Sequence, residues 1–329
     1  MKKLALLLLV PFLVFSSCKK DTEETPPATT ESQKVLTQYL VDNGMDLPAV
    51  LTDWIVGPPA DLADVDAFVD TYNIIDIRGD IDLFNAGHIA GAKFSVLADV
   101  LTVAAEFPDQ TKTVLVACFT GQSAAHAVVA LKLSGYNAKV LKWGMAGWRA
   151  EYSVNNWDKN SGVDNGNAAV GSGSWDLQPT ERTLDEFSLP TFTTTATDGA
   201  GILAERVQNM LDNGFKVVSN ANVLGTPENY YINNFWALSD YEAHGCIINA
   251  YRIKPLSITD DLMKYYNPDE TAVTYCWTGQ TSSMVTAYLN VIGYNAVSLA
   301  YGTNGMIWSD LEPNHQFVAT TVDRPVVAE

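Results

Sequence analysis

Two cysteines in this chain open the same short pattern of residues. Cys118 begins the segment Cys-Phe-Thr-Gly-Gln-Ser, and Cys276 begins Cys-Trp-Thr-Gly-Gln-Thr. Residue 276 lies 158 positions after residue 118, and the same offset relates a Gly-Tyr-Asn triplet and several glycines further along both segments. An offset that holds over about sixty residues without an insertion predicts two copies of one domain. Each copy then has a cysteine at the same structural point.

Each cysteine is predicted to end a buried strand and to precede a helix. Residues 113–117 are a run of β-formers, and residues 123–133 are rich in Ala, Val and Leu and stop before Gly135. Residues 272–275 and 282–292 repeat this order around the second cysteine. In a parallel α/β sheet, ligand crevices lie at the carboxyl ends of the strands. Both cysteines are therefore expected at such a crevice.

The turn after each cysteine is suited to hold a sulfur anion. Unpaired N–H groups at a helix start point toward the sulfur, and the helix dipole favours the thiolate. A lone buried cysteine is more often a small hydrophobic residue, but two in matching settings favour a functional interpretation. The expected cradle consists of Phe119, Thr120, Gly121, Gln122 and Ser123 in the first copy and Trp277, Thr278, Gly279, Gln280 and Thr281 in the second.

The first copy contains four ordered motifs: residues 73–78, which end in Asp76 and Arg78, residues 87–92, the Cys118 loop and residues 143–148. Together they resemble motifs of the rhodanese family, sulfurtransferases that carry a sulfane sulfur as a cysteine persulfide. Residues 73–78 look like the family's strand ending in Asp-x-Arg, here Asp76 and Arg78. Residues 87–92 match its Gly-His-Ile-x-Gly-Ala turn, the cysteine loop follows, and residues 143–148 match its closing Gly-x-x-Gly-Trp segment. The resemblance implies an α/β fold with two rhodanese-like domains, each a mostly parallel sheet with helices on both faces.

The second copy resembles the family less before its cysteine and more at the loop. Residues 245–250 occupy the place of the Gly-His-Ile-x-Gly-Ala turn, with Cys246 replacing the histidine. Residues 217–221 are expected as the counterpart of the Asp-x-Arg strand, without its charges. The loop itself fits the Cys-x-x-Gly-x-Thr pattern of tandem thiosulfate and mercaptopyruvate sulfurtransferases, whose carboxyl-terminal copy is the active one. The resemblance thus implies Cys276 as the first catalytic candidate and Cys118 as the second.

Neither cysteine loop contains the lysine or arginine that is usual in rhodaneses acting on thiosulfate. Backbone amides and hydroxyls alone would hold an anionic donor, so thiosulfate is expected to be a poor one. Phe119 and Trp277 either wall a pocket for a less polar persulfide or polysulfide, or simply pack. Asp76 and Arg78 are expected mainly as a structural ion pair, with Arg78 the nearest cation if thiosulfate binds the first copy.

The cysteine loops and the histidines argue against a phosphatase and against a metal site. Ala124 and Ser282 stand six residues after the cysteines, where a protein tyrosine phosphatase needs an arginine. The cysteines form no Cys-x-x-Cys pair and no two histidines have ligand spacing, so neither a metal nor another cofactor is expected. His88, His126 and His244 are expected to be structural or surface groups.

The amino terminus resembles a bacterial lipoprotein signal. Lys2 and Lys3 precede an apolar run at residues 4–15 that is too short to span a membrane. Small residues then lead to Cys18, which we expect to be lipidated, so that residues 1–17 are a signal peptide and residues 18–33 a tether. This places the protein at a bacterial cell envelope, on its periplasmic or outer-surface face. An ordinary secretory signal is the alternative.

Charge and cysteine count agree with an exported, folded protein. Without Lys2 and Lys3, 18 basic residues face 38 acidic ones, a net charge of −20. Such acidity argues against nucleic acid as a partner. The three cysteines after Cys18 do not form a disulfide framework, although Cys246 could resolve an oxidised Cys276.

Two rhodanese-like domains are predicted, at residues 34–152 and 196–329, joined by a linker at residues 153–195 that is rich in Gly, Asn, Ser and Thr. An aromatic segment at residues 223–241 could be a substrate lid or an interdomain contact. The predicted function is transfer of sulfane sulfur from a thiosulfate, polysulfide or mercaptopyruvate-like donor to a thiol or cyanide-like acceptor. The alternative is a non-catalytic rhodanese-like binding or redox module at the cell envelope.

Overall fold

The computed structural model describes residues 30–329. The predicted signal peptide, the lipidation site Cys18 and most of the tether lie outside the described residues. None of the helices within residues 30–329 combines the length and apolar character that a membrane crossing requires.

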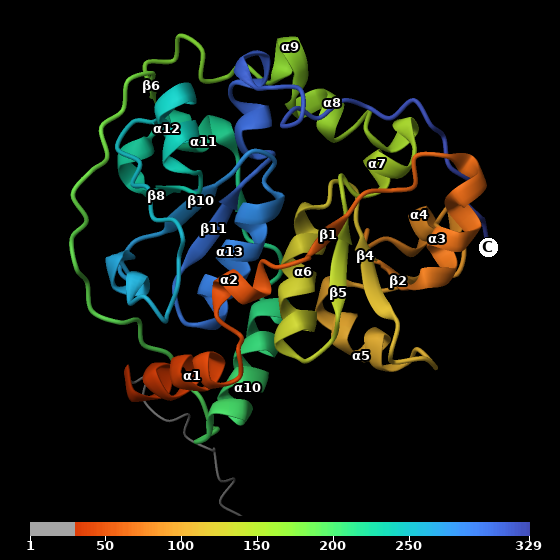
Figure 1. Cartoon of the computed structure of the whole chain (residues 1–329), viewed down its shortest axis with the longest axis horizontal. Coiled ribbons are helices and arrows are strands. Elements are labelled where there is room, and N and C mark those ends of the chain that lie inside the picture. Colours follow the sequence, from red (N-terminus) through yellow and green to blue (C-terminus); the bar gives the residue numbers. More distant parts are fainter. Residues whose placement is uncertain (1–29) are drawn as a thin grey trace, which may run out of the picture.

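The first half of the described chain is built on a five-stranded sheet with the order β1-β5-β4-β2-β3, in which every neighbouring pair is parallel. Its strands are β1 (Ile55–Val56), β2 (Tyr72–Asp76), β3 (Lys93–Phe94), β4 (Thr113–Ala117) and β5 (Ala138–Leu141). The central strands β2 and β4 are buried on both faces after their first residue. β4 is an almost continuous apolar run, whereas β2 also buries Asn73 and Asp76. Their carboxyl ends meet at one edge, where the first cysteine loop begins (Figure 1).

The second half is built on a four-stranded parallel sheet with the order β7-β11-β10-β8. Its strands are β7 (Val217–Val218), β8 (Tyr231–Asn234), β10 (Ala272–Tyr275) and β11 (Ala296–Leu299). The pairing registers of the two sheets correspond with the offset of 158 positions: Asp76 pairs with Ala117, and Asn234 pairs with Tyr275. The predicted parallel α/β architecture, with helices flanking the sheets, is therefore confirmed (Figure 1).

This register corrects one expected equivalence. Residues 217–221 do not replace the Asp-x-Arg strand, because β7 pairs with β11 as β1 pairs with β5. The strand that takes the place of β2 is β8, from the aromatic segment at residues 223–241. Consequently Asn234 stands where Asp76 is, and Trp236 stands where Arg78 is. The aromatic segment is thus a core strand and its flanks, and the lid interpretation was wrong: Tyr231, Trp236 and Tyr241 are buried.

The helices cover the faces of both sheets. Those of the first half are α1 (Thr30–Asp42), α2 (Leu47–Val50), α3 (Val65–Thr71), α4 (Ile81–Ala86), α5 (Val100–Ala105), α6 (Gln122–Leu133) and α7 (Met145–Trp148). Those of the second half are α10 (Gly199–Asp212), α11 (Asn220–Gly225), α12 (Leu238–His244) and α13 (Gln280–Val291). The helices predicted at residues 123–133 and 282–292 are both present, as α6 and α13, with ends shifted by one or two residues.

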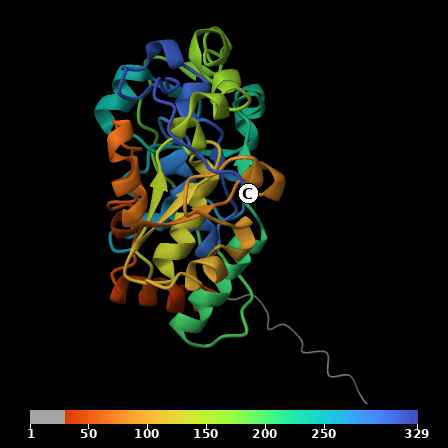
Figure 2. The same ribbon diagram turned by 90° about the vertical axis from the view of Figure 1, so that its right-hand side faces the viewer.

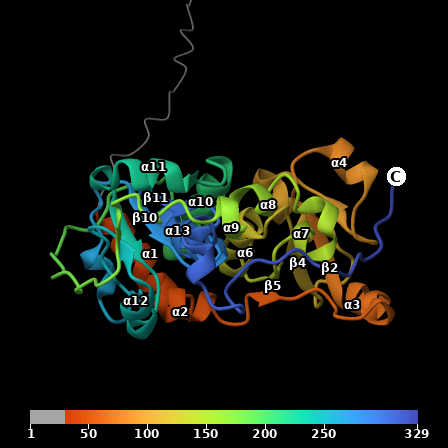
Figure 3. The ribbon, with the colours of Figure 1, turned by 90° about the horizontal axis from the view of Figure 1, so that it is seen from above.

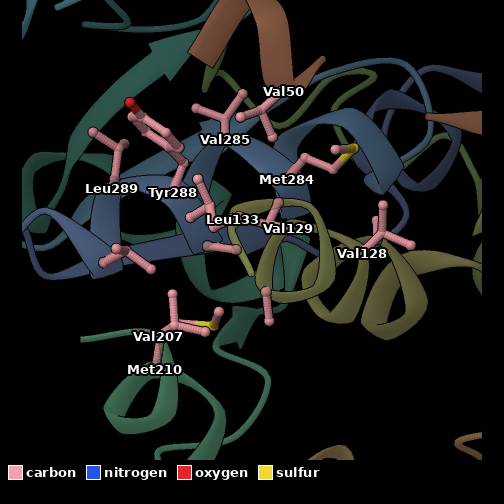
Figure 4. Packing of buried hydrophobic residues seen from close by; sticks show 14 of the residues in the cluster. Val50, Val128, Val129, Leu133, Val207, Met210, Met284, Val285, Tyr288 and Leu289 are labelled. Carbon is pink, nitrogen blue, oxygen red and sulfur yellow. The ribbon is translucent and has the colours of Figure 1, made fainter. Parts of the chain in front are cut away.

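The two halves share one apolar core. Helices α6 and α13, which follow the two cysteine loops, lie side by side between the sheets, and α10 packs against both (Figure 3). Val129 and Leu133 of α6 meet Met284 and Leu289 of α13 in a continuous buried cluster (Figure 4). Because each helix starts at a cysteine loop, this packing also brings the two loops to the same interface.

The segment between the halves is long but not structureless. It contains the short helices α8 (Trp157–Asn160) and α9 (Gly162–Asn165) and the strand β6 (Trp175–Asp176), which pairs antiparallel with β9 (Cys246–Ile247). Its remainder runs along the outside of the second half (Figure 1).

The two ends of the described chain pack far from their sequence neighbours. Helix α1 packs on α10 of the second half, and the carboxyl-terminal segment crosses back to the first half (Figure 2). There Val327 forms an antiparallel bridge with His88, and the buried guanidinium of Arg324 donates hydrogen bonds to the carbonyls of Gly147 and Pro59. The second half therefore ends by completing the first.

Candidate active site

Cys118 lies at the carboxyl end of β4 and is only 3% exposed. Gly121 adopts the left-handed conformation with φ 81°, which turns the chain sharply into α6. Two backbone N–H groups then donate to the Cys118 Sγ, those of Gly121 at 3.1 Å and Ala124 at 3.4 Å. Of the five residues predicted as a cradle, Gly121 donates its N–H to this sulfur, and the second donor, Ala124, was not predicted. Both N–H groups stabilise negative charge on the sulfur.

A cavity of about 250 Å³ opens beside Cys118. Both halves of the chain line it, and its lining contains no carboxylate. The lining residues of the first half are Ile77, Arg78, Cys118, Phe119, Thr120, Gln122, Ser123 and Asn156, and those of the second half are Phe215, Val217, Ala300 and Tyr301. A ligand in this cavity would touch the sulfur, one cation and several apolar walls.

Arg78 is the cation of this cavity. Its side chain is 1% exposed and forms an ion pair with Asp76, with Nη2 to Oδ2 at 2.8 Å. Nη2 also donates to the Gly87 carbonyl at 2.6 Å, whereas no group among residues 30–329 accepts a hydrogen bond from Nη1. The guanidinium lies 5.7 Å from the ring centroid of Phe119. The ion pair expected from the sequence is present, and it leaves the buried Nη1 group without a hydrogen-bond partner among residues 30–329.

Cys276 is also 3% exposed but has different partners. Its Sγ accepts from the N–H of Ser282 at 3.3 Å and donates to the Ser282 Oγ at 3.6 Å. That hydroxyl is in turn 2.8 Å from the hydroxyl of Ser298. The second sulfur therefore sits in a neutral hydroxyl network, and it does not line the cavity of Cys118.

Aromatic rings occupy the space beside the second loop where the first loop has its cation. Trp236, at the position of Arg78, stacks on Trp277 with ring centroids 4.0 Å apart. His315 stacks on the other side of Trp277 at 4.1 Å, and His244 meets the same indole edge-on at 5.3 Å. Trp277 is thus a packing residue, whereas Phe119 is a cavity wall.

The two loops touch each other through their glutamines. The Gln280 Nε2 donates to the Thr120 carbonyl at 2.9 Å, and the Gln122 Oε1 accepts from the N–H of Tyr301 at 2.8 Å. A Cβ at Gly121 would collide with the side chain of Gln280, and one at Gly279 with the side chain of Gln122. The predicted cradle residues of both copies are therefore brought together at one interface.

The hydroxyls of the two loops mostly support the backbone. The Thr120 Oγ1 accepts from the side-chain amide of Gln122 at 3.1 Å, and the Thr278 Oγ1 accepts from the N–H of Gln280 at 3.2 Å. Ser123 lines the cavity, and Thr281 is half-buried at the start of α13.

The remaining cysteine and the histidines are structural. Burial raises the pKa of Cys246 to about 11, despite a hydrogen bond with the Tyr241 hydroxyl, so this thiol stays protonated. His88 stacks on Phe84 at 3.8 Å, and its Nδ1 is 2.9 Å from the Phe84 carbonyl. Burial lowers the pKa of His126 to about 4. Within residues 30–329, no group of three or more His, Cys, Asp or Glu side chains is placed to hold a metal ion.

Sequence reasoning missed the walls that the second half contributes to the cavity. Tyr301 has φ 59°, and Trp143, at the same position in the first half, has φ 67°. An aromatic residue with positive φ before a glycine is unusual, and the paired Trp-Gly and Tyr-Gly dipeptides were a signal for it. Phe215 and Ala300 have no such signal, because only the packing of the halves brings them to Cys118.

One part of the chain matches the model of a known protein family. Residues 61–151 match the family model described as "Rhodanese-like domain". No curated protein sequence matches the chain.

Several solved structures are similar to it. A rhodanese-related protein from Thermoplasma volcanium has 22% sequence identity and a TM-score of 0.25, covering 30% of this chain and 93% of its own. A thiosulfate sulfurtransferase from Pseudomonas aeruginosa has 15% identity and a TM-score of 0.29, covering 88% and 48%. A 3-mercaptopyruvate sulfotransferase from Escherichia coli has 16% identity and a TM-score of 0.28, covering 76% and 98%.

The matched range begins before β2 and ends after α7, so it includes Asp76, Arg78 and the loop of Cys118, whereas the loop of Cys276 lies beyond it. The chain therefore contains a rhodanese-like domain at residues 61–151, with Cys118 in its cysteine loop.

Proposed function

We propose that the protein is a rhodanese-type sulfurtransferase that carries a sulfane sulfur as a persulfide on Cys118. The observation that carries this proposal is the composition of the Cys118 site. A buried sulfur with two N–H donors lies beside a cavity of about 250 Å³, and Arg78, whose Nη1 group has no hydrogen-bond partner within residues 30–329, lines the same cavity.

The reaction divides into two sulfur transfers. With thiosulfate or a polysulfide, the Cys118 thiolate attacks the outer sulfur, the donor's S–S bond breaks, and the leaving group departs with the electron pair, as sulfite when the donor is thiosulfate. With mercaptopyruvate, the thiolate attacks the thiol sulfur, the C–S bond breaks, and pyruvate leaves as its enolate, which takes up a proton from water. An acceptor thiolate or cyanide then attacks the outer sulfur of the persulfide, and the Cys118 thiolate returns. The N–H groups of Gly121 and Ala124 stabilise the anionic sulfur before and after each transfer.

The lining of the cavity favours an anionic donor with an apolar part. Arg78 supplies the only cation of the lining, while Phe119, Phe215 and Val217 supply apolar walls. A small, doubly charged donor such as thiosulfate would gain from one guanidinium but not from the walls. An organic persulfide or a polysulfide would use both.

Cys276, the first candidate from the sequence, is supported less well. The stack of Trp236, Trp277 and His315 fills the place that the cation takes beside Cys118. Its thiol also has a hydroxyl acceptor of its own in Ser282. We therefore assign the sulfur-carrying role to Cys118, and the experiment below tests Cys276 as the alternative.

The deciding experiment is intact-protein mass spectrometry after exposure to thiosulfate, polysulfide or mercaptopyruvate in turn. The proposal expects a gain of one sulfur atom in the wild type and in Cys276→Ser, and none in Cys118→Ser. Loss of the gain in Cys276→Ser alone would return the role to the second cysteine. No gain with any donor would favour the alternative, a non-catalytic binding or redox module, which the absence of cations from both loops also motivates.

We further propose that the protein is anchored in a bacterial envelope through a lipid on Cys18. The supporting observation is the sequence alone, in which small residues precede this cysteine after an apolar run. Metabolic labelling with a radioactive fatty acid should mark the wild type and not Cys18→Ala. Equal labelling of both would exclude this anchor.

A further inference from the structure

The peptide group between Thr120 and Gly121 is held at both of its polar ends. Its carbonyl oxygen accepts from the Gln280 Nε2 at 2.9 Å, and its N–H donates to the Cys118 Sγ at 3.1 Å. A trans peptide is planar, with its C=O and N–H pointing in opposite directions. A hydrogen bond that fixes the oxygen on one side therefore aims the N–H at the sulfur on the other.

The residue that fixes this oxygen comes from the other half of the chain. Gln280 begins α13, and its side chain is buried at the interface, with the residue 1% exposed. It lies directly over Gly121, where a Cβ would collide with its amide. The absence of a side chain at Gly121 thus makes room for this glutamine as well as for the turn.

The second loop provides an internal comparison, because it lacks this arrangement. The symmetry-related Gln122 uses its Oε1 to accept from the N–H of Tyr301 and its Nε2 to donate to Thr120, and it makes no hydrogen bond to the Thr278 carbonyl within residues 30–329. In the same part of the chain, the Cys276 sulfur receives an N–H from Ser282 but none from Gly279. The glycine N–H reaches the sulfur only in the loop whose carbonyl is held from outside.

We propose that Gln280 is a positioning residue for the sulfur chemistry of Cys118. The second half then contributes to the first site through one side-chain amide that orients the Gly121 N–H, in addition to its cavity walls. This inference rests on the proposed function for its catalytic meaning, but the orientation of the amide can be tested without sulfur transfer.

The test compares Gln280→Met, which keeps the length of the side chain but removes the donor, with Gln280→Glu, which also places a negative charge beside the Thr120 carbonyl. Gln208→Met is the matched control, since Gln208 also donates across the interface, to the Ala98 carbonyl, but lies on the exposed face of α10. Circular dichroism and thermal melting first establish that each variant is folded.

The main measurement is the rate of alkylation of Cys118 against pH, read by peptide mass spectrometry in the full chain. Loss of one aligned N–H donor should move the midpoint of the profile upward by about one pH unit in Gln280→Met, and further in Gln280→Glu. The midpoint for Cys276 in the same samples and that for Cys118 in Gln208→Met should stay in place. Sulfur transfer, measured as kcat/KM, should fall about tenfold in Gln280→Met.

The outcomes separate the two proposals. An unchanged Cys118 midpoint in both folded Gln280 variants would overturn the positioning role, whatever happens to thermal stability. A shifted midpoint in a protein whose wild type transfers no sulfur would support the positioning role and reject the proposed function. A shifted midpoint together with reduced transfer would support both.

Discussion

The indole of Trp236 stacks on that of Trp277 at a centroid separation of 4.0 Å and an interplanar angle of 24°. In the first half, Arg78 and Phe119 occupy the corresponding positions, with the guanidinium 5.7 Å from the ring. The acidic partner has changed as well, since Asn234 stands where Asp76 is. A buried ion pair in one half thus corresponds to a neutral aromatic stack in the other. This difference accounts for a cation near one cysteine and none near the other.

The first prediction concerns the ion pair itself. Asp76→Ala would leave the guanidinium of Arg78 buried without a counter-charge, which should cost about 3–5 kcal/mol of the free energy of unfolding. Urea denaturation checks this, with Asp53→Ala as the control, because Asp53 pairs with Lys139 while remaining 70% exposed. Equal, small losses in both variants would mean that the Asp76 pair is not what holds this edge of the sheet.

Arg78→Lys separates charge from geometry at the cavity. Lysine keeps the positive charge but lacks the planar fork that serves Asp76 and Gly87 while leaving Nη1 free. We expect KM for an anionic donor to rise about tenfold with a smaller change in kcat, because the loss is mainly in donor binding. Steady-state cyanolysis with thiosulfate gives both constants. A change confined to kcat would instead place Arg78 in the transfer step.

Asp46 should make the contact between the halves sensitive to acid. Burial raises its pKa, but hydrogen bonds from the Ile258 and Thr259 N–H groups and from the Thr259 and Ser257 hydroxyls outweigh this, and the pKa is lowered overall. A depressed carboxyl pKa contributes stability that is present above the unfolded value, about 3.9, and is lost as pH falls through the folded value. Asp46→Asn should therefore reduce stability at pH 7 and make little difference near pH 2.

The measurement for Asp46 is urea denaturation at several pH values. Asp42→Asn is a suitable control, because among residues 30–329 the Asp42 side chain accepts a hydrogen bond only from the exposed side chain of Gln38. A deficit of the Asp46 variant that stays constant from pH 7 to pH 2 would contradict the assignment.

His126 predicts a second loss of stability at milder acidity. Burial lowers its pKa from 6.5 to about 4, so the unfolded chain takes up a proton before the folded chain does. Stability is therefore present above pH 6.5 and is lost as pH falls toward 4, by roughly 3 kcal/mol for this shift. His126→Leu should flatten the stability curve in that window. Parallel curves for the two proteins would show that this imidazole does not titrate there.

Because His126 lies edge-on to Phe215 at 5.7 Å, its protonation would also disturb a wall of the cavity.

The shared core predicts that the halves unfold together. Leu289 of α13 is fully buried in the cluster that also contains Val129 and Leu133 of α6 (Figure 4). Leu289→Ala should cost about 2–5 kcal/mol and shift one cooperative transition rather than split it in two. Coincident urea curves from tryptophan fluorescence and circular dichroism check this. Two separated transitions would mean that the halves are independent.

Much of the architecture could be predicted from the sequence because its signals are local. The strands β4 and β10 have the predicted ends, since apolar β-formers stop at a cysteine and a glycine turn follows. The counterpart of the Asp-x-Arg strand was misplaced, because β8 lacks both charges and its aromatic surroundings resemble an insertion. Only the pairing with β10 identifies it.

The different surroundings of the two cysteines could not be predicted either, for a similar reason. Their loops are nearly identical in sequence, and the differences that matter lie outside them. Arg78, Trp236 and Tyr301 reach the loops from other strands and from the other half. A pattern within six residues cannot report contacts that form only when two sheets pack.

The return of the carboxyl-terminal segment to the first half has a consequence during protein synthesis. The carbonyls of Gly147 and Pro59 receive the guanidinium of Arg324, and the indole N–H of Trp148 donates to the Pro325 carbonyl. Arg324 and Pro325 are synthesised after all the strands of both sheets. The first half, although translated first, therefore lacks these partners until Arg324 and Pro325 have emerged, and a chain that stalls before Arg324 carries an incomplete first domain.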